Sequence, residues 1–230
     1  MKDRVLIWIV LLIVTFTLTG NNLVFDSLDI PDDVTKKTFK SISQTNSPDD
    51  IVGQIVNSPI YLINKPNLII ADNIIGNFTN STHPCGIWLI NCPNTQIYNN
   101  TITNITSTSN TASAIHIVNS ENTTIWNNTI EMITSTSSVI GYPRDIYGIR
   151  INNSMETAIS DVKISQLKSS YGNGYGISIE SSQTSKINDS EIDDINSKSS
   201  HGIRVYNSPF TIVEDNIITN IFSSTLTSFG

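Results

Sequence analysis

The chain has 230 residues and a formal net charge of −7, and only 14% of its residues are charged. This length allows one elongated domain with a continuous core. A nucleic-acid partner would require a basic stripe on the protein, so the low and acidic charge argues against one. The polar residues are mostly Asn, Ser and Thr, which indicates a surface of amides and hydroxyls.

The N-terminus resembles an export signal. Lys2 and Arg4 precede an apolar run from Val5 to Leu18, and a short polar stretch follows. The run is shorter than the about 18 to 20 residues of a membrane span and matches the core of a signal peptide. No small-x-small cleavage site follows it, so residues 1–22 are predicted to be either a signal peptide or an uncleaved N-terminal anchor. Both predict a secreted or cell-surface protein that contacts a membrane only through this segment.

Residues 23–58 lie outside the repeats described below and are rich in Asp and Lys. The first coil of a repeat protein exposes unpaired strands and apolar side chains, which a cap normally covers. We expect a short helix over Asp33 to Ser43 to supply this cap, with Val34 and Phe39 facing the first coil. A flexible spacer is the alternative.

Residues 59–230 form an internal repeat. The unit that begins at Gly86 reads G-I-W-L-I-N-C-P-N-T-Q-I-Y-N-N-T-I-T-N-I. Related units begin at Pro59, Ala114, Gly148, Gly176 and Gly202. Their spacing of 26 to 34 residues is typical of proteins in which each repeat is one supersecondary unit stacked on the next.

Apolar residues recur at five positions of each unit, which in the first unit are Ile60, Leu62, Ile70, Ile75 and Phe78. The first two positions are two residues apart and therefore share one face of a strand. The Ile and Val content also favours strands. Each unit is predicted to contain about three short strands joined by polar turns.

Asparagine recurs at the turns. One column consists of Asn64, Asn91, Asn119, Asn153 and Asn207, with Ser181 as the exception. A second column consists of Asn73, Asn100, Asn128 and Asn216. Asparagine tolerates the left-handed backbone of a sharp corner, and its amide can bond to the equivalent amide one coil away. Such ladders predict an all-β fold, a right-handed parallel β-helix of about six coils behind an N-terminal cap.

On these repeats the chain resembles the pectate-lyase-like superfamily and, within it, the NosD-like and other secreted β-helix repeat proteins. The resemblance covers residues 59–230. Members of that superfamily include lyases, hydrolases, phage spikes and non-catalytic surface proteins, so the resemblance implies the fold and no single activity.

The residue between the two inward positions of Gly-Ile-x-Ile points outward. This column reads Tyr61, Trp88, His116, Arg150, Ser178 and Arg204. Successive members are expected to lie one strand spacing apart, ~4.8 Å. Aromatic faces stack on sugar rings and Arg binds carboxylates, so the column predicts a polysaccharide site. Ordinary cross-strand packing is the alternative, and it also applies to a second outward pair, Tyr98 and Trp126.

The units differ in length mainly before each Gly-Ile, so the inserts are expected to emerge on one side of the coil, usually the binding side. The inserts carry a second set of candidate glycan ligands, Tyr142, Arg144, Asp145, Tyr171 and Tyr175, with His201 at the end of the last insert. The tyrosines could instead only anchor the loops.

Catalysis is left open. Glu131 and Asp193 occupy one column two coils apart, roughly 9.6 Å, near the upper limit of the carboxyl separation in glycosidases. Pectate lyases use calcium-binding acids, and an acidic column is present at Asp161, Asp189 and Asp215. Because Asn99 and Asn127 occupy the same turn position elsewhere, a ladder role is preferred and no cofactor is predicted. Copper, which the NosD-like resemblance would imply, is not predicted because the three histidines are scattered and Met is scarce.

Cys85 and Cys92 are about 23 Å apart in an extended chain, too far for a disulfide, and are expected to be two small, semi-buried residues. Eight N-x-S/T sequons occur, at Asn77, Asn80, Asn99, Asn104, Asn122, Asn127, Asn152 and Asn188. They reflect either the turn chemistry of the repeat or glycosylation of an exported chain.

No cap follows the last repeat, whose apolar pattern continues through Ile221. A bare last coil would expose apolar faces and unpaired amides. We therefore expect either further coils beyond residue 230 or end-to-end self-association.

Together these features predict an exported or cell-surface protein that binds polysaccharide along its flank. A polysaccharide lyase or glycoside hydrolase is the first alternative, and a passive surface-layer scaffold is the second.

Overall fold

The computed structural model describes residues 50–81, 83–136 and 144–224, together with the strand residues 18–19, 22–23 and 228–229. The chain divides into two units, residues 1–37 and 38–230. In the first unit, β1 (Leu18–Thr19) pairs antiparallel with β2 (Asn22–Leu23). The apolar run before Leu18 and the predicted cap at Asp33 to Ser43 lie outside the described residues. None of the described residues belongs to a helix long and apolar enough to cross a membrane.

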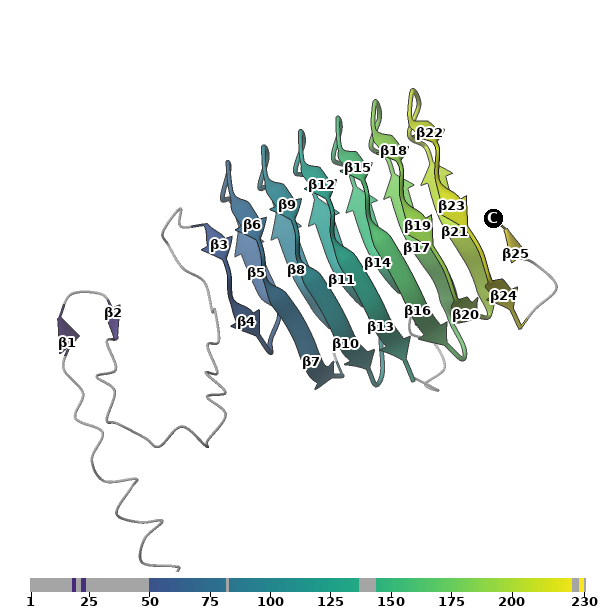
Figure 1. Cartoon of the computed structure of the whole chain (residues 1–230), viewed down its shortest axis with the longest axis horizontal. Helices are drawn as coiled ribbons and strands as arrows, with labels where there is room; N and C mark the ends of the chain where they lie inside the picture. Colours follow the sequence, from purple (N-terminus) through teal and green to yellow (C-terminus); the bar gives the residue numbers. More distant parts are fainter. Residues whose placement is uncertain are drawn as a thin grey trace, which may run out of the picture. The chain divides into compact units, whose positions relative to one another are not determined.

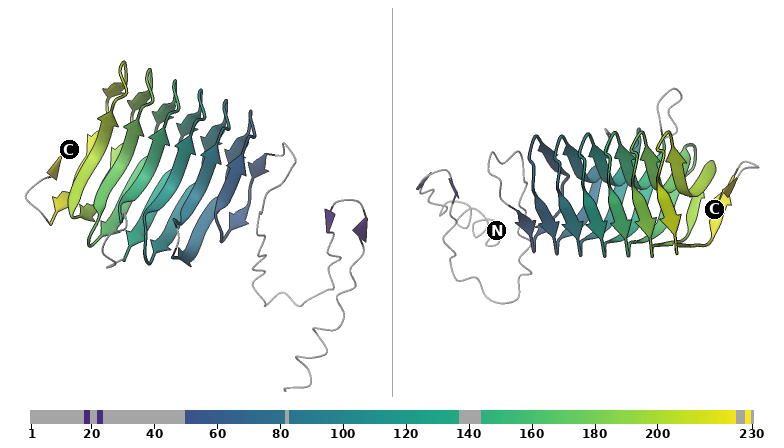
Figure 2. Two further views of the ribbon diagram at one scale, coloured as in Figure 1. Left: turned by 180° about the vertical axis from the view of Figure 1, so that it is seen from behind. Right: turned by 90° about the horizontal axis from the view of Figure 1, so that it is seen from above.

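The second unit is a parallel β-solenoid of about six coils, which confirms the predicted fold class. Each coil contributes one strand or strand pair to each of three sheets, and equivalent strands of successive coils lie side by side (Figures 1 and 2). Sheet 1 contains β5 (Ile60–Ile63), β8 (Cys85–Ile90), β11 (Ala112–Val118), β14 (Ile146–Asn152), β17 (Asn173–Glu180), β21 (Ser199–Tyr206) and β25 (Ser228–Phe229).

The other two sheets are built in the same way. Sheet 2 contains β3 (Ile51–Val52), β6 (Ile69–Ala71), β9 (Gln96–Tyr98), β12 (Thr124–Trp126), β15 (Ala158–Ser160), β18 (Lys186–Asn188) and β22 (Ile212–Glu214). Sheet 3 contains β4 (Ile55–Val56), β7 (Ile74–Asn80), β10 (Thr101–Ser107), β13 (Thr129–Ser135), β16 (Lys163–Ser169), β19 (Glu191–Ile192), β20 (Ile195–Ser197), β23 (Ile217–Ile218) and β24 (Ile221–Ser223).

The strand register confirms all five apolar columns. In sheet 1, for example, Ile115 lies opposite Ile87 on one side and opposite Ile149 on the other. These side chains are fully buried and belong to one continuous core inside the coil. In the last described coil the equivalent residues are more open, and Val205 and Val213 are exposed.

The backbone conformation at the corners of the coil explains why asparagine recurs there. Every non-glycine residue with a positive φ in the described coils falls at one of four positions that recur in each coil, headed by Asn64, Asn67, Asp72 and Asn77. L-residues avoid this left-handed conformation, and Asn and Asp tolerate it best. The first position is the predicted Asn64 column, in which the exception Ser181 has the same backbone conformation.

Hydrogen bonds along these columns join the coils. At the exposed corners Asn91 Nδ2 donates to Asn64 Oδ1 (2.9 Å), and Asn122 and Asn127 donate in the same way to the coil before. Several sequon asparagines therefore have a structural partner. The second predicted column is buried, and Asn100 Nδ2 donates to Asn128 Oδ1 (2.9 Å).

A further inner ladder was not predicted. Backbone N–H groups donate to the buried hydroxyl of the next coil, as from Ser120 to Ser154 Oγ (3.0 Å) and from Ser154 to Ser182 Oγ (2.9 Å). Cys92 heads this column, and its N–H donates to Ser120 Oγ (2.8 Å). Cys85 and Cys92 are not paired with each other, as predicted, but they are fully rather than partly buried, and Cys92 takes a position that serine fills elsewhere.

Candidate functional site

The predicted outward column lies on the outer face of sheet 1. Register pairs place Tyr61 opposite Trp88, Trp88 opposite His116, and His116 opposite Arg150. The column continues through Ser178 to Arg204. It is therefore a real row of adjacent side chains along the coil axis.

The rings of the first coils pack against one another. The Trp88 ring meets Tyr61 edge-on, with centroids 5.2 Å apart, and stacks on His116 at 5.3 Å. His83, two residues before β8, lies over both rings at 5.1 Å from Trp88 and 5.6 Å from His116. The expectation that the histidines are scattered is therefore wrong for His83 and His116, because the turn before β8 brings His83 onto the row.

A neighbouring outward column carries a second stack of rings. Tyr147, Tyr175 and His201 lie opposite one another in β14, β17 and β21, with centroid separations of 4.9 and 5.0 Å. Tyr175 was expected in an insert, but both Tyr147 and Tyr175 belong to strands and are buried. Their register pairing extends these strands upstream of Gly-Ile.

Two arginines join the columns. The Arg150 guanidinium lies 4.8 Å from the centre of the Tyr147 ring, and that of Arg204 lies 5.7 Å from the Tyr175 ring. We call the combined surface the aromatic row; it comprises Tyr61, His83, Trp88, His116, Tyr147, Arg150, Tyr175, His201 and Arg204. It runs along the coil axis across the strands of sheet 1 from β5 to β21.

The row is partly enclosed. His116 is only 6% exposed, so it does not point freely into solvent as the sequence suggested, and its Nε2–H donates to Asn152 Oδ1 (3.2 Å). Trp88, Arg150 and Arg204 are half-buried. Among the described residues, Trp88 Nε1 and His116 Nδ1 are buried and have no hydrogen-bond partner.

The charge of the row resides on its arginines. Burial, reinforced by the Arg150 charge, lowers the pKa of His83 to about 4 and that of His116 to about 3, so both imidazoles are neutral at neutral pH. Arg204 pairs with Glu180 at 3.5 Å. Arg150 has no carboxylate partner within the described part of the chain, which leaves its N–H donors available to a ligand.

The remaining described insert residues contact one another. Asp145 Oδ1 accepts a hydrogen bond from the N–H of Asn173 (2.8 Å), and the Arg144 guanidinium lies 5.3 Å from the exposed Tyr171 ring. These contacts join the described end of the longest insert to the insert of the next coil. Tyr142 lies outside the described residues.

The carboxyl pair considered for catalysis lies on sheet 3, apart from the row. Glu131 accepts a hydrogen bond from Thr103 Oγ1 (3.3 Å). Asp193 accepts from Thr219 Oγ1 (2.8 Å) and Asn220 Nδ2 (2.7 Å), and these bonds lower its pKa. A lowered pKa keeps Asp193 ionised, which does not suit a general acid.

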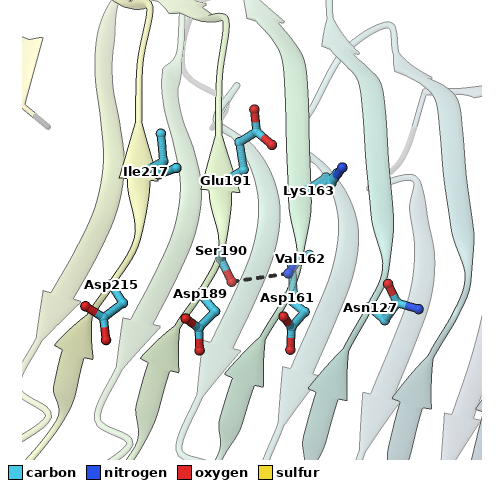
Figure 3. Close-up of a pocket in the computed structure, with 9 residues that line it drawn as sticks. All are labelled: Asn127, Asp161, Val162, Lys163, Asp189, Ser190, Glu191, Asp215 and Ile217. Carbon is cyan, nitrogen blue, oxygen red and sulfur yellow. Dashed lines mark hydrogen bonds between the residues drawn. The ribbon is translucent and has the colours of Figure 1, made fainter.

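The acidic column is the continuation of an exposed corner ladder. Asp161, Asp189 and Asp215 have the same left-handed backbone as Asn99 and Asn127. Figure 3 shows their carboxylates in a line along one edge of an open groove of about 380 Å³. The groove is lined by Asn127, Asp161, Val162, Lys163, Asp189, Ser190, Glu191, Asp215 and Ile217. No group of three His, Cys, Asp or Glu residues in the described coils is arranged to hold a metal ion.

Comparisons of the chain with protein-family models, with curated proteins and with solved structures gave no match.

Proposed function

We propose that the protein binds a polysaccharide along the aromatic row. The observation that supports this proposal is a pair of ring stacks that follow the coil axis on sheet 1 and are linked by Arg150, which lies opposite His116 and over the Tyr147 ring. The half-buried members of the row lie one or two strand spacings of ~4.8 Å apart and offer contacts in series to a linear polymer, whereas His116, Tyr147 and Tyr175 are buried beneath them. Aromatic faces stack on pyranose rings, and the guanidinium of Arg150 is available to a carboxylate or sulfate on the chain.

The test is binding of acidic oligosaccharides to the full chain, measured by a glycan array and then by calorimetry. Trp88→Ala and Arg150→Ala should each raise the dissociation constant by about tenfold, the effect of losing one stacking or charge-assisted contact. Trp126→Ala, which removes a half-exposed ring on sheet 2, is the matched control and should leave this binding unchanged. Equal binding by the native protein and the three variants would exclude the row as the binding site.

Analysis of the same samples for cleaved sugar separates the alternatives. Unsaturated products would identify a lyase, and new reducing ends would identify a hydrolase. Retention without products would identify a binding protein, and neither retention nor products would favour a scaffold.

We also propose that the protein is exported, because residues 1–22 match a signal peptide or N-terminal anchor. Cell fractionation of the full chain tests this proposal, and protein confined to the cytoplasm would contradict it.

Finally, we propose that the coils belong to the pectate-lyase-like superfamily, on the strength of the parallel solenoid and its Asn ladders. An experimental structure with a left-handed coil would contradict that assignment.

A further inference from the structure

Sheet 2 carries a second aromatic feature, separate from the aromatic row. Tyr98 in β9 and Trp126 in β12 lie opposite each other and stack with ring centroids 4.3 Å apart and planes 15° apart. Both side chains are half-buried, so their outer edges are open to solvent.

The stack ends abruptly on both sides. Ala71 lies opposite Tyr98 on the preceding coil, and Ser160 lies opposite Trp126 on the next coil. In β15 both outward residues, Ala158 and Ser160, are small, whereas the next coil presents the larger side chains of β18. The ring face of Trp126 that points away from Tyr98 is therefore not covered by a large side chain from β15.

This arrangement makes a slot one coil wide. Ser160 lies opposite Trp126 on one side and opposite Asn188 on the other. With strands ~4.8 Å apart, the backbones that carry Trp126 and Asn188 are separated by about 9.6 Å. One ligand ring can occupy this gap at stacking distance from the indole. We call this gap the Trp126 slot and define it by Trp126, Ala158, Ser160 and Asn188.

The slot also offers hydrogen-bonding groups. Neither the indole Nε1–H of Trp126 nor the hydroxyl of Ser160 bonds to any residue in the described coils. A ring with an apolar face and hydroxyl groups at its edge, such as a pyranose, matches this combination of an aromatic wall and free polar groups.

The charge beside the slot differs from that of the row. Ser160 is followed directly by Asp161, and the exposed carboxylates of Asp161, Asp189 and Asp215 continue along this corner (Figure 3). Two lysines lie nearby, but Glu191 lies opposite Lys163 on the next strand, and Lys186, opposite Ala158, pairs with Glu214 at 2.8 Å. The carboxylates disfavour an acidic sugar here and favour a protonated amino sugar.

We propose that the Trp126 slot binds a pyranose without a carboxylate, with preference for an amino sugar. It is a second site, and it does not depend on the aromatic row.

Plain cross-strand packing is the competing explanation of the Tyr98 and Trp126 stack. Ser160→Tyr distinguishes the two, because it extends the stack by one ring and fills the slot. If the stack only stabilises the coil, this variant should fold at least as stably and alter no binding. If the slot is a site, the variant should fold and lose the ligand.

The experiment is calorimetric titration of the full chain with three probes: a glucosamine tetramer, its N-acetylated form and a galacturonic acid tetramer. We expect the glucosamine tetramer to bind more tightly than the N-acetylated form. Trp126→Ala and Ser160→Tyr should each weaken both by about tenfold or more. Circular dichroism checks that each variant is folded.

Trp88→Ala separates this proposal from the proposed function. It should reduce galacturonate binding and leave glucosamine binding unchanged. The slot is excluded if the full chain binds neither amino nor neutral probe, if Ser160→Tyr binds them as the native protein does, or if Trp88→Ala abolishes their binding. If the full chain does not bind galacturonate but binds glucosamine in a way that Ser160→Tyr abolishes, the aromatic row is excluded and the slot is supported.

Discussion

His83 and His116 are two imidazoles packed face to face within the aromatic row, 5.6 Å apart and beside Arg150. Burial and the nearby guanidinium both penalise a second positive charge. The row is therefore assembled around neutral imidazoles, and its packing depends on their protonation.

The free energy of unfolding is expected to fall as the pH is lowered from about 6.5 toward 4. Both imidazoles bind protons near pH 6.5 when unfolded, but near 4 for His83 and near 3 for His116 in the folded protein. The unfolded state binds more protons in this window, so stability is complete above pH 6.5 and lost below it. At a pH of about 4.5 the loss is about 2 to 3 kcal/mol per imidazole.

Urea unfolding at about pH 7.5 and about pH 4.5 measures this loss, and His83→Phe is the control. Phenylalanine keeps a stacking ring and removes the titration, so the variant should lose about half as much stability on acidification. An equal loss in the variant and the native protein would show that His83 does not contribute.

At the scale of the strands, the Gly column of sheet 1 sets how closely coils approach. A Cβ added to Gly148 would lie 2.6 Å from the Gly176 carbonyl oxygen and 2.8 Å from Ile164 Cγ2. The coil must therefore shift to accept any side chain at Gly148. Ala114 occupies the same column and is buried, so one coil of the native protein accommodates a methyl group at this position.

Gly148→Ala should lower the free energy of unfolding by about 1 to 3 kcal/mol, the usual cost of overpacking a close-packed interior. Thermal unfolding measures the change. Ala114→Gly is the matched control in the same column and should cost no more than about 1 kcal/mol, the entropic effect of glycine. A melting temperature for Gly148→Ala equal to that of the native protein would mean that the spacing is softer than the structure indicates.

At the scale of the whole solenoid, two surfaces of opposite charge lie on different sheets. The aromatic row on sheet 1 carries Arg150 and Arg204, whereas the corner after sheet 2 carries the carboxylates of Asp161, Asp189 and Asp215. Because Arg204 pairs with Glu180, the guanidinium of Arg150 is the charge that makes the row a local cationic surface on an acidic protein.

Salt should therefore weaken the binding of charged ligands at both surfaces. Raising the ionic strength from about 0.1 M to about 1 M shortens the screening length from ~10 Å to ~3 Å. Calorimetry at the two ionic strengths should show weaker binding of galacturonate at the row and of glucosamine at the Trp126 slot. Binding of the N-acetylated tetramer should change little. A similar loss for the neutral probe would show that the selectivity is not electrostatic.

What the sequence determined by itself is the coil. The repeat units differ in length only in the inserts, so there is one way to align successive coils that places every Ile column inward. With that alignment the Asn columns fall at the left-handed corners. The outward column from Tyr61 to Arg204 follows from the same register.

The tertiary structure alone decided which side chains from outside that column join it. His83 precedes a strand, and Tyr147 and Tyr175 lie in segments whose length differs between units, so no periodic pattern locates them. Their positions depend on how each turn packs on the coil beneath. That packing also buries His116, which alternation along the strand had assigned to the solvent side. Periodicity assigns a residue to a face of a sheet, but only the folded turns determine what covers that face.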